Sequence, residues 1–276
     1  MAKSQKTVVT NTFQKWVIGI FALLIYVPTF LWMWERWFAR DSYYSHGILI
    51  PFVMIYLLWL KRAALKKITP EKSSWGLWLF FIGIAIHLLG ALFRVYFISG
   101  FSMIFVLYGL ILHFYGTKVF KEVLFPVSFL IFMIPLPEVV IVNLSFRLKI
   151  FAAQLAVSTL NHMHIFCVQQ GSTIIMRHAT VVVEDVCSGL RSLITLMALS
   201  SLFAYWMKSS MLKRSILFLS AIPIAVITNV MRIIFLASVN EVWGTKIAAG
   251  PIHETSGFIV FIGAFCLLYT VQKMIE

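Results

Sequence analysis

The sequence predicts an all-α polytopic membrane protein of about eight transmembrane helices, carrying a small extracytoplasmic insertion built from an amphipathic helix and a β-hairpin. Hydrophobic residues make up 61% of the chain and charged residues only 12%, too few to cover the surface of a soluble domain. The mean hydropathy of +0.93 points the same way. Apolar runs also recur at lengths that cross a bilayer core of about 30 Å. We expect a single membrane domain over residues 1–276.

The apolar runs predict the spans in chain order. The polar, basic N-terminus precedes a long apolar stretch with no small-residue cleavage site, which indicates a retained helix and not a removed signal peptide. The second run is short and needs tilt or a partly buried end. The eight predicted spans are Trp16–Trp34, His46–Leu60, Trp75–Phe93, Tyr96–Tyr115, Val119–Pro135, Cys187–Trp206, Ser215–Val239 and Thr255–Val271.

The net charge of +13 is distributed as in a membrane protein and not as in a nucleic-acid-binding domain. Basic residues are scattered between apolar runs, and the two densest clusters, Lys61–Lys67 and Lys208–Arg214, fall on the side of the N-terminus. The positive-inside rule therefore predicts that both termini are cytoplasmic. Nucleic acid is not an expected partner, whereas the lipid bilayer is.

Residues 136–186 then form one extracytoplasmic segment. Pro135 and Pro137 end the fifth span, and residues 138–163 place apolar side chains at helical spacing with polar ones between them, as in an amphipathic helix at the outer interface. Residues 166–183 are rich in Val, Ile and Thr around two turn candidates, which predicts a small hairpin or meander.

This segment leads to Cys187, the candidate nucleophile. Arg191 follows four residues later, so the two side chains would share one face of a continuous helix. A helix N-terminus and a neighbouring guanidinium both favour a thiolate, which would lower the thiol pKa below about 8.5. Ser188 and the glycine after it allow close backbone approach. The plain alternative is a small buried hydrophobe, as most membrane cysteines are.

Further ionisable residues gather near the same outer level. Charged side chains inside apolar runs cost about 2.5–3.5 kcal/mol each on insertion scales, so they are either functional or paired. Arg232 lies seven residues before the outer end of its span, roughly 10 Å deep at about 1.5 Å per residue. The structural alternative for Arg232 is an ion pair or a carbonyl clamp between helices, and Asn229 on the same face could belong to either interpretation. His253 opens the last span and could instead cap it. Glu184 and Asp185 precede the thiol.

A second polar stretch, residues 41–47, stands at the outer mouth of the second span. It contains Asp41 and His46, and we weigh a capping loop equally against a role in positioning substrate. The three cysteines and the histidines show no metal-ligand spacing, so neither a disulfide framework nor a metal or other cofactor is expected.

These motifs together resemble the exosortase family, bacterial relatives of the archaeosortases. The resemblance is carried, in the family's order, by five stretches covering nearly the whole chain, of which the Cys-Ser-Gly-Leu-Arg element is the most specific: residues 41–51, Pro135–Pro137, Glu184–Ser192, Asn229–Ile233, and His253 with Gly257.

The resemblance implies a bacterial inner-membrane cysteine transpeptidase or protease with its active site on the periplasmic side. Its substrates would be membrane-anchored proteins with a C-terminal sorting signal of the PEP-CTERM type. Its catalytic trio maps onto Cys187, Arg232 and His253. We expect Cys187 to form a thioacyl intermediate, Arg232 to stabilise the oxyanion and His253 to carry the proton. Arg191 would favour the thiolate, and Glu184 or Asp185 would orient His253 or balance the arginines.

The rival interpretation is a non-catalytic transporter or an export component of a secretion system. Arg191, Arg232 and His253 would then line an anion or proton path. Such a path needs polar residues through the inner half of the same spans, but residues 193–204 and 216–227 are almost wholly apolar apart from small hydroxyls. The sequence therefore favours a one-sided pocket, and it leaves the oligomeric state and the final acyl acceptor open.

Overall fold

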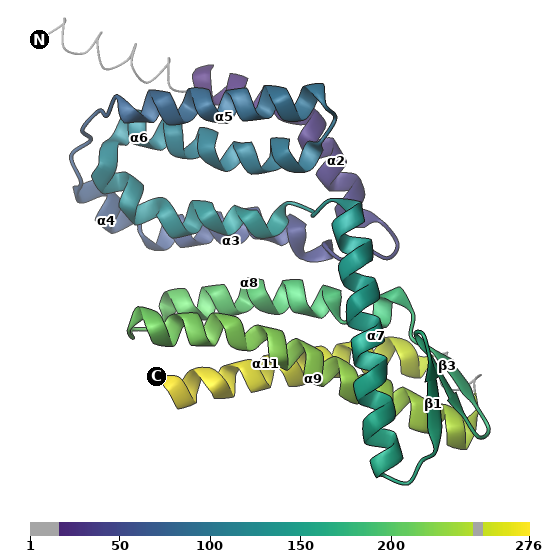
Figure 1. Ribbon diagram of the computed structural model, residues 1–276. Coiled ribbons are helices and arrows are strands. Elements are labelled where there is room, and N and C mark those ends of the chain that lie inside the picture. The colour runs from purple at the N-terminus through teal and green to yellow at the C-terminus, as the bar shows by residue number, and fades with distance from the viewer. Residues whose placement is uncertain (1–16, 245–250) are drawn as a thin grey trace, which may run out of the picture. The chain divides into compact units, whose positions relative to one another are not determined.

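The computed structural model describes residues 17–244 and 251–276, apart from the side chains of residues 186 and 251–254. The chain divides into two compact units, residues 1–135 and 136–276. Both are dominated by helices (Figure 1).

The first unit consists of helices joined by short turns. Five described α-helices follow the helix Val17–Ile25, which meets α2 at a bend of 54°. Two 3₁₀ turns, η1 and η2, stand before α3 and after α6. The elements are α2 Val27–Phe38, η1 Ser45–Ile48, α3 Leu49–Leu60, α4 Arg62–Lys67, α5 Trp75–Leu92, α6 Tyr96–Ser128 and η2 Phe129–Met133.

Helix α6 is two antiparallel arms joined at Gly116. This glycine has φ +80° and ψ −178°, which only glycine adopts readily, and a Cβ there would collide with the backbone oxygen of Glu71. The Tyr108 hydroxyl donates a 2.6 Å hydrogen bond to the carbonyl oxygen of Leu124. A straight helix would separate residues 16 positions apart by about 24 Å, so the chain reverses direction between them. The reversal falls between the predicted fourth and fifth spans.

Helices α5 and α6 pack closely because glycines line their contact. A Cβ at Gly109 would lie 2.5 Å from the backbone nitrogen of Phe80, and a Cβ at Gly83 would lie 2.7 Å from the Val106 side chain. Such close approach is typical of helices that associate within a membrane.

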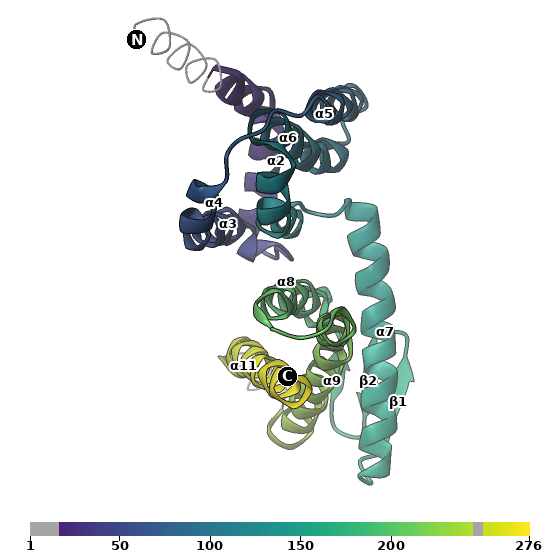
Figure 2. The same ribbon diagram turned by 90° about the vertical axis from the view of Figure 1, so that its left-hand side faces the viewer.

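The second unit carries a three-stranded antiparallel sheet beside four helices (Figures 1 and 2). Strands β1, β2 and β3 pair in chain order, so the segment is a meander with one strand more than a hairpin. The elements are α7 Glu138–His162, β1 Cys167–Gln170, β2 Thr173–Met176, β3 Thr180–Val182, η3 Asp185–Cys187, α8 Leu190–Trp206, α9 Met211–Trp243 and α11 Pro251–Ile275.

Helix α9 is the centre of this unit and packs against α7, α8 and α11. Both views show α8, α9 and α11 lying alongside one another, with α7 running across them (Figures 1 and 2). Small residues of α7, including Ala153 and Ala156, are fully buried in a core shared with the sheet and with α9. Helix α7 therefore runs across the direction of α8, α9 and α11, and its place along the outer membrane surface stays a prediction.

The number of membrane crossings is bounded by helix length and hydropathy. Among the described residues, five helices qualify as candidate spans, or six if the bent pair Val17–Ile25 and α2 counts as one. They include α7 and count α6 as a single helix, whereas α3 and α8 are apolar but shorter. The chain is thus a multi-pass, mainly helical membrane protein, and the total of eight spans stays a prediction.

Candidate active site

Cys187 lies in the second unit, at the end of the 3₁₀ turn η3 and before α8 begins. Only 5% of its surface is exposed, and it belongs to the core formed by α7, the sheet and α9. Gly189 follows at φ +82° and starts α8 as a left-handed residue. Cys187 and Arg191 are therefore not one turn apart on a continuous helix, and that expectation was wrong.

Asn229 of α9 fixes this turn. Its side-chain amide donates a 2.7 Å hydrogen bond to the carbonyl oxygen of Cys187, and 5% of Asn229 is exposed. A Cβ on Gly189 would lie 3.0 Å from the Asn229 Cγ, so the contact also needs a glycine. Ser188, buried beside them, accepts a 3.3 Å hydrogen bond from the backbone nitrogen of Leu190. Asn229 and Ser188 thus shape the backbone around the thiol.

The cation that lowers the pKa of the Cys187 thiol is Arg232 of α9. Burial is the largest effect and raises the Cys187 pKa; the Arg232 guanidinium lowers it, and the Glu184 carboxylate raises it. The predicted low pKa is therefore wrong, because removing the thiolate from water outweighs the cation. A mostly protonated thiol needs a base before it can attack a carbonyl.

Arg232 links α9 to α11. Its Nε donates a 3.1 Å hydrogen bond to the Ser256 hydroxyl, and Gly257 packs on the guanidinium, so that a Cβ there would lie 3.5 Å from one terminal nitrogen. His253 lies in α11 three residues before Ser256. Its side chain is outside the described part of the chain. Positions three and four apart share a face of a regular helix, so the spacing favours a place for His253 near Arg232, which stays a prediction.

The remaining candidates occupy different surroundings. The Asp185 carboxylate forms an ion pair at 2.7 Å with the ammonium of Lys149 in α7. The Lys149 side chain is 16% exposed. Glu184 is exposed. Arg191 is half-buried in the first turn of α8, and its Nε is buried without a hydrogen-bond partner among the described residues.

Asp41 and His46 belong to the first unit. Asp41 is exposed, whereas His46 is partly buried in η1, stacks on Tyr44 with ring centroids 5.9 Å apart and bonds to the backbone of Phe132. Burial lowers the His46 pKa to about 4, so its imidazole is neutral near pH 7. The neighbouring Trp37 indole donates a 2.8 Å hydrogen bond to the Met133 carbonyl oxygen, and its ring packs on Gly47. These contacts hold residues 41–47 against η2, and neither a capping role nor positioning of substrate by Asp41 or His46 is decided by them.

Ser256 and Lys149 are the contacts that sequence reasoning missed. Ser256 sits beside Gly257 and one turn after His253, a spacing that could have indicated it. Lys149 could not be linked to Asp185 from sequence, because the two residues are 36 positions apart and meet only when α7 packs on the turn. Among the described residues, no cluster of three His, Cys, Asp or Glu could hold a metal ion.

This geometry defines a class of protein. The chain is a helical membrane protein with a buried thiol, and the pKa of that thiol is lowered by an arginine that links two helices. The sequence matches the transmembrane exosortase family (Exosortase_EpsH) over residues 24–270, and the chain belongs to that family. Membership supports a general role as a membrane transpeptidase. No curated protein and no solved structure gave a significant match.

Proposed function

We propose that the chain is a membrane-embedded cysteine transpeptidase or protease that cleaves the C-terminal sorting signal, of PEP-CTERM type, from exported proteins anchored in the bacterial inner membrane. The observation that carries this proposal is the Arg232 side chain. Its charge acts on the Cys187 thiol, and its guanidinium is held by Ser256, three residues after His253.

In the proposed reaction, His253 takes the proton of the Cys187 thiol as the sulfur attacks the scissile carbonyl. Arg232 binds the resulting oxyanion, for which its permanent charge and several N–H donors suit it. The tetrahedral intermediate collapses by breaking the C–N bond, and the histidine returns its proton to the leaving amine. The thioacyl enzyme then passes its acyl group to water or to an incoming amine, whose proton His253 accepts.

The raised thiol pKa fits this order of events. Burial keeps Cys187 protonated in the resting protein, so nucleophile activation waits for a base and for the substrate. A thiolate formed only at that moment is protected from adventitious alkylation and oxidation. Arg232 opposes the effect of burial and is already in place when the charge develops.

We propose that the site lies on the periplasmic side, and the charged residues of α7 support a position of this helix at a membrane surface. Arg147 and Lys149 occupy the middle of this helix; Arg147 is exposed and has no hydrogen-bond or ion-pair partner in the described residues. An unpaired arginine at the centre of a span costs about 2.5–3.5 kcal/mol. A helix along the outer interface avoids that cost, and it lets a substrate anchored by its own helix reach Cys187 by lateral diffusion.

Co-expression with a tagged sorting-signal protein tests the function. Cys187→Ala should abolish the processed product, because no other group in the proposed reaction can form the acyl enzyme. Cys167→Ala is the matched control, since Cys167 is buried at 6% in the same core and has no charged partner in the described residues. We expect it to process normally. Wild-type protein should also yield a hydroxylamine-sensitive adduct. Processing that persists in Cys187→Ala would contradict the proposal.

A further inference from the structure

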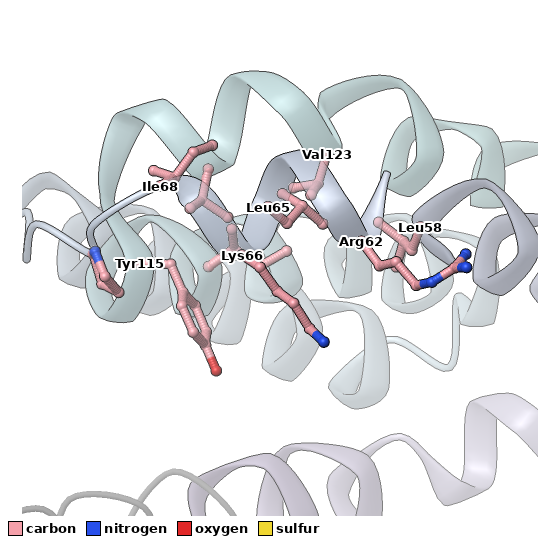
Figure 3. A pocket seen from close by; sticks show the side chains of 10 residues that line it. Leu58, Arg62, Leu65, Lys66, Ile68, Tyr115 and Val123 are labelled. Atoms are coloured by element: carbon pink, nitrogen blue, oxygen red, sulfur yellow. The ribbon is translucent and has the colours of Figure 1, made fainter. Parts of the chain in front are cut away.

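The first unit contains a pocket of about 600 Å³, built from α3, α4, the segment after α4 and both arms of α6 (Figure 3). This volume is within the range of about 300–1,000 Å³ that is typical of small-molecule sites. Its walls are mainly aliphatic, and the apolar side chains that line it include Leu58, Leu65, Ile68, Ile111, Val119 and Val123.

The apolar part of the pocket fits a hydrocarbon chain. Val119 and Val123 of α6 are buried, and Leu65 of α4 is half-buried, so these side chains form a continuous wall and not scattered surface positions. Water gains few hydrogen bonds against such a wall, whereas an alkyl chain makes dispersion contacts along its length. In a membrane protein, lipid acyl chains supply that alkyl group.

Two basic side chains one helical turn apart, Arg62 and Lys66, border the same pocket. Arg62 lies 3.9 Å from the ring centroid of Trp59 and donates a 2.9 Å hydrogen bond to the Trp59 carbonyl oxygen, which fixes the guanidinium while leaving other N–H groups to donate. Lys66 has no hydrogen-bond or ion-pair partner within residues 17–244 and 251–276. Figure 3 shows its ammonium end extending away from the aliphatic wall.

The nearby carboxylates are already engaged by other lysines. Glu122 forms an ion pair with Lys61 at 2.9 Å, and Glu71 forms one with Lys118 at 2.8 Å. The positive charge of Arg62 and Lys66 is therefore uncompensated beside an apolar pocket. Trp59 at this level is typical of the membrane–water interface, where lipid phosphates lie.

We propose that this pocket binds an anionic phospholipid, with one acyl chain against Leu65, Val119 and Val123 and the headgroup phosphate on Arg62 and Lys66. The net negative charge of the lipid matters because two cations meet it and the adjacent acids are paired. The site uses residues of the first unit alone, so the proposal does not depend on the chemistry of Cys187.

Native mass spectrometry of the full chain in detergent tests the site with two lipids that share acyl chains, phosphatidylglycerol and phosphatidylcholine. We expect phosphatidylglycerol to bind at least tenfold more tightly. The double variant Arg62→Gln with Lys66→Gln should lose most of this preference, and Leu65→Trp, which fills the pocket, should weaken both lipids. Inorganic phosphate alone should not compete at equal concentration, because it lacks the chain.

Lys67→Gln is the matched control, since Lys67 has the same charge on the same helix but does not line the pocket. It should bind phosphatidylglycerol like the wild type. The glutamine substitutions replace exposed side chains, and thermal melting of each variant confirms folding. Equal affinity for the two lipids, an unchanged preference in the double variant, or the same loss in Lys67→Gln would each overturn the proposal.

Discussion

The Asn229 side chain donates a hydrogen bond of 2.7 Å to the backbone carbonyl oxygen of Cys187, joining the centre of α9 to the turn that carries the thiol. The bond is buried and links residues 42 positions apart. It therefore fixes the sulfur-bearing backbone through tertiary structure and not through helix propensity. Replacing Asn229 should therefore act first on the conformation of the turn that carries Cys187.

Asn229→Ala should lower the free energy of unfolding by about 1–3 kcal/mol, because it leaves the buried Cys187 carbonyl without its donor. It should also lower processing and raise the alkylation rate of Cys187 by exposing it. Asn240→Ala is the matched control on the same helix: its amide reaches Thr180 at 3.5 Å, and its Oδ1 is already without a partner. The idea fails if both variants behave alike in thermal melting and alkylation.

Arg232→Lys should reduce processing by about 10²- to 10³-fold although it keeps the charge, because the compact ammonium lacks the planar fork that donates to Ser256 from Nε and to an oxyanion from the terminal nitrogens. Ser256→Ala should cost about tenfold, the worth of one hydrogen bond. Arg177→Lys, in the exposed turn between β2 and β3, should have no effect. Single-turnover cleavage of a sorting-signal substrate measures all three. Near-normal turnover in Arg232→Lys would remove the oxyanion role.

The reactivity of Cys187 toward iodoacetamide should keep rising above pH 9, because burial raises the thiol pKa above its ordinary value. Arg232→Gln removes the charge that lowers this pKa, so the midpoint should move to higher pH. Glu184→Gln removes a charge that raises it, so the midpoint should move to lower pH. A Cys167→Ala, Cys266→Ser background isolates the signal. Shifts in the opposite directions would show that neither side chain acts on the thiol as described.

Gly116→Ala should lower the free energy of unfolding by about 3 kcal/mol or more, because it combines backbone strain with a collision against the Glu71 carbonyl. Gly171→Ala is the control, since its φ of +62° is also left-handed but a Cβ there meets nothing within 4 Å. That variant should cost only about 1–2 kcal/mol. Thermal melting in detergent compares them. Equal losses would mean that the reversal in α6 tolerates a side chain.

Sequence reasoning grouped Cys187, Arg232 and His253 because polar residues are costly in apolar runs and therefore stand out. It could not foresee the break at Gly189, since hydrophobic periodicity shows which residues are apolar but not where a backbone turns left-handed. It gave Arg191 the role of stabilising the Cys187 thiolate, because a spacing of four residues predicts neighbours on one helix. The contacts made by Arg232, Lys149 and Asn229 depend on packing between helices, which spacing does not encode.

It also placed the reversal between the fourth and fifth spans and a β-rich segment after residue 166, where composition changes sharply. The third strand and the burial of Cys187 follow instead from packing the sheet on α7 and α9. Within a single span, local pattern carries most of the information. At the site, by contrast, Cys187 is surrounded by residues of α7, the sheet and α9.

The hydrogen bond between Arg232 and Ser256 has a consequence for biosynthesis. A ribosome delivers Cys187 and Arg232 to the translocon well before Ser256, so an emerging chain carries its sulfur for some time without the partner that positions the guanidinium. In the proposed reaction, cleavage would therefore wait for insertion of the last helix, which carries both Ser256 and the proton-carrying His253.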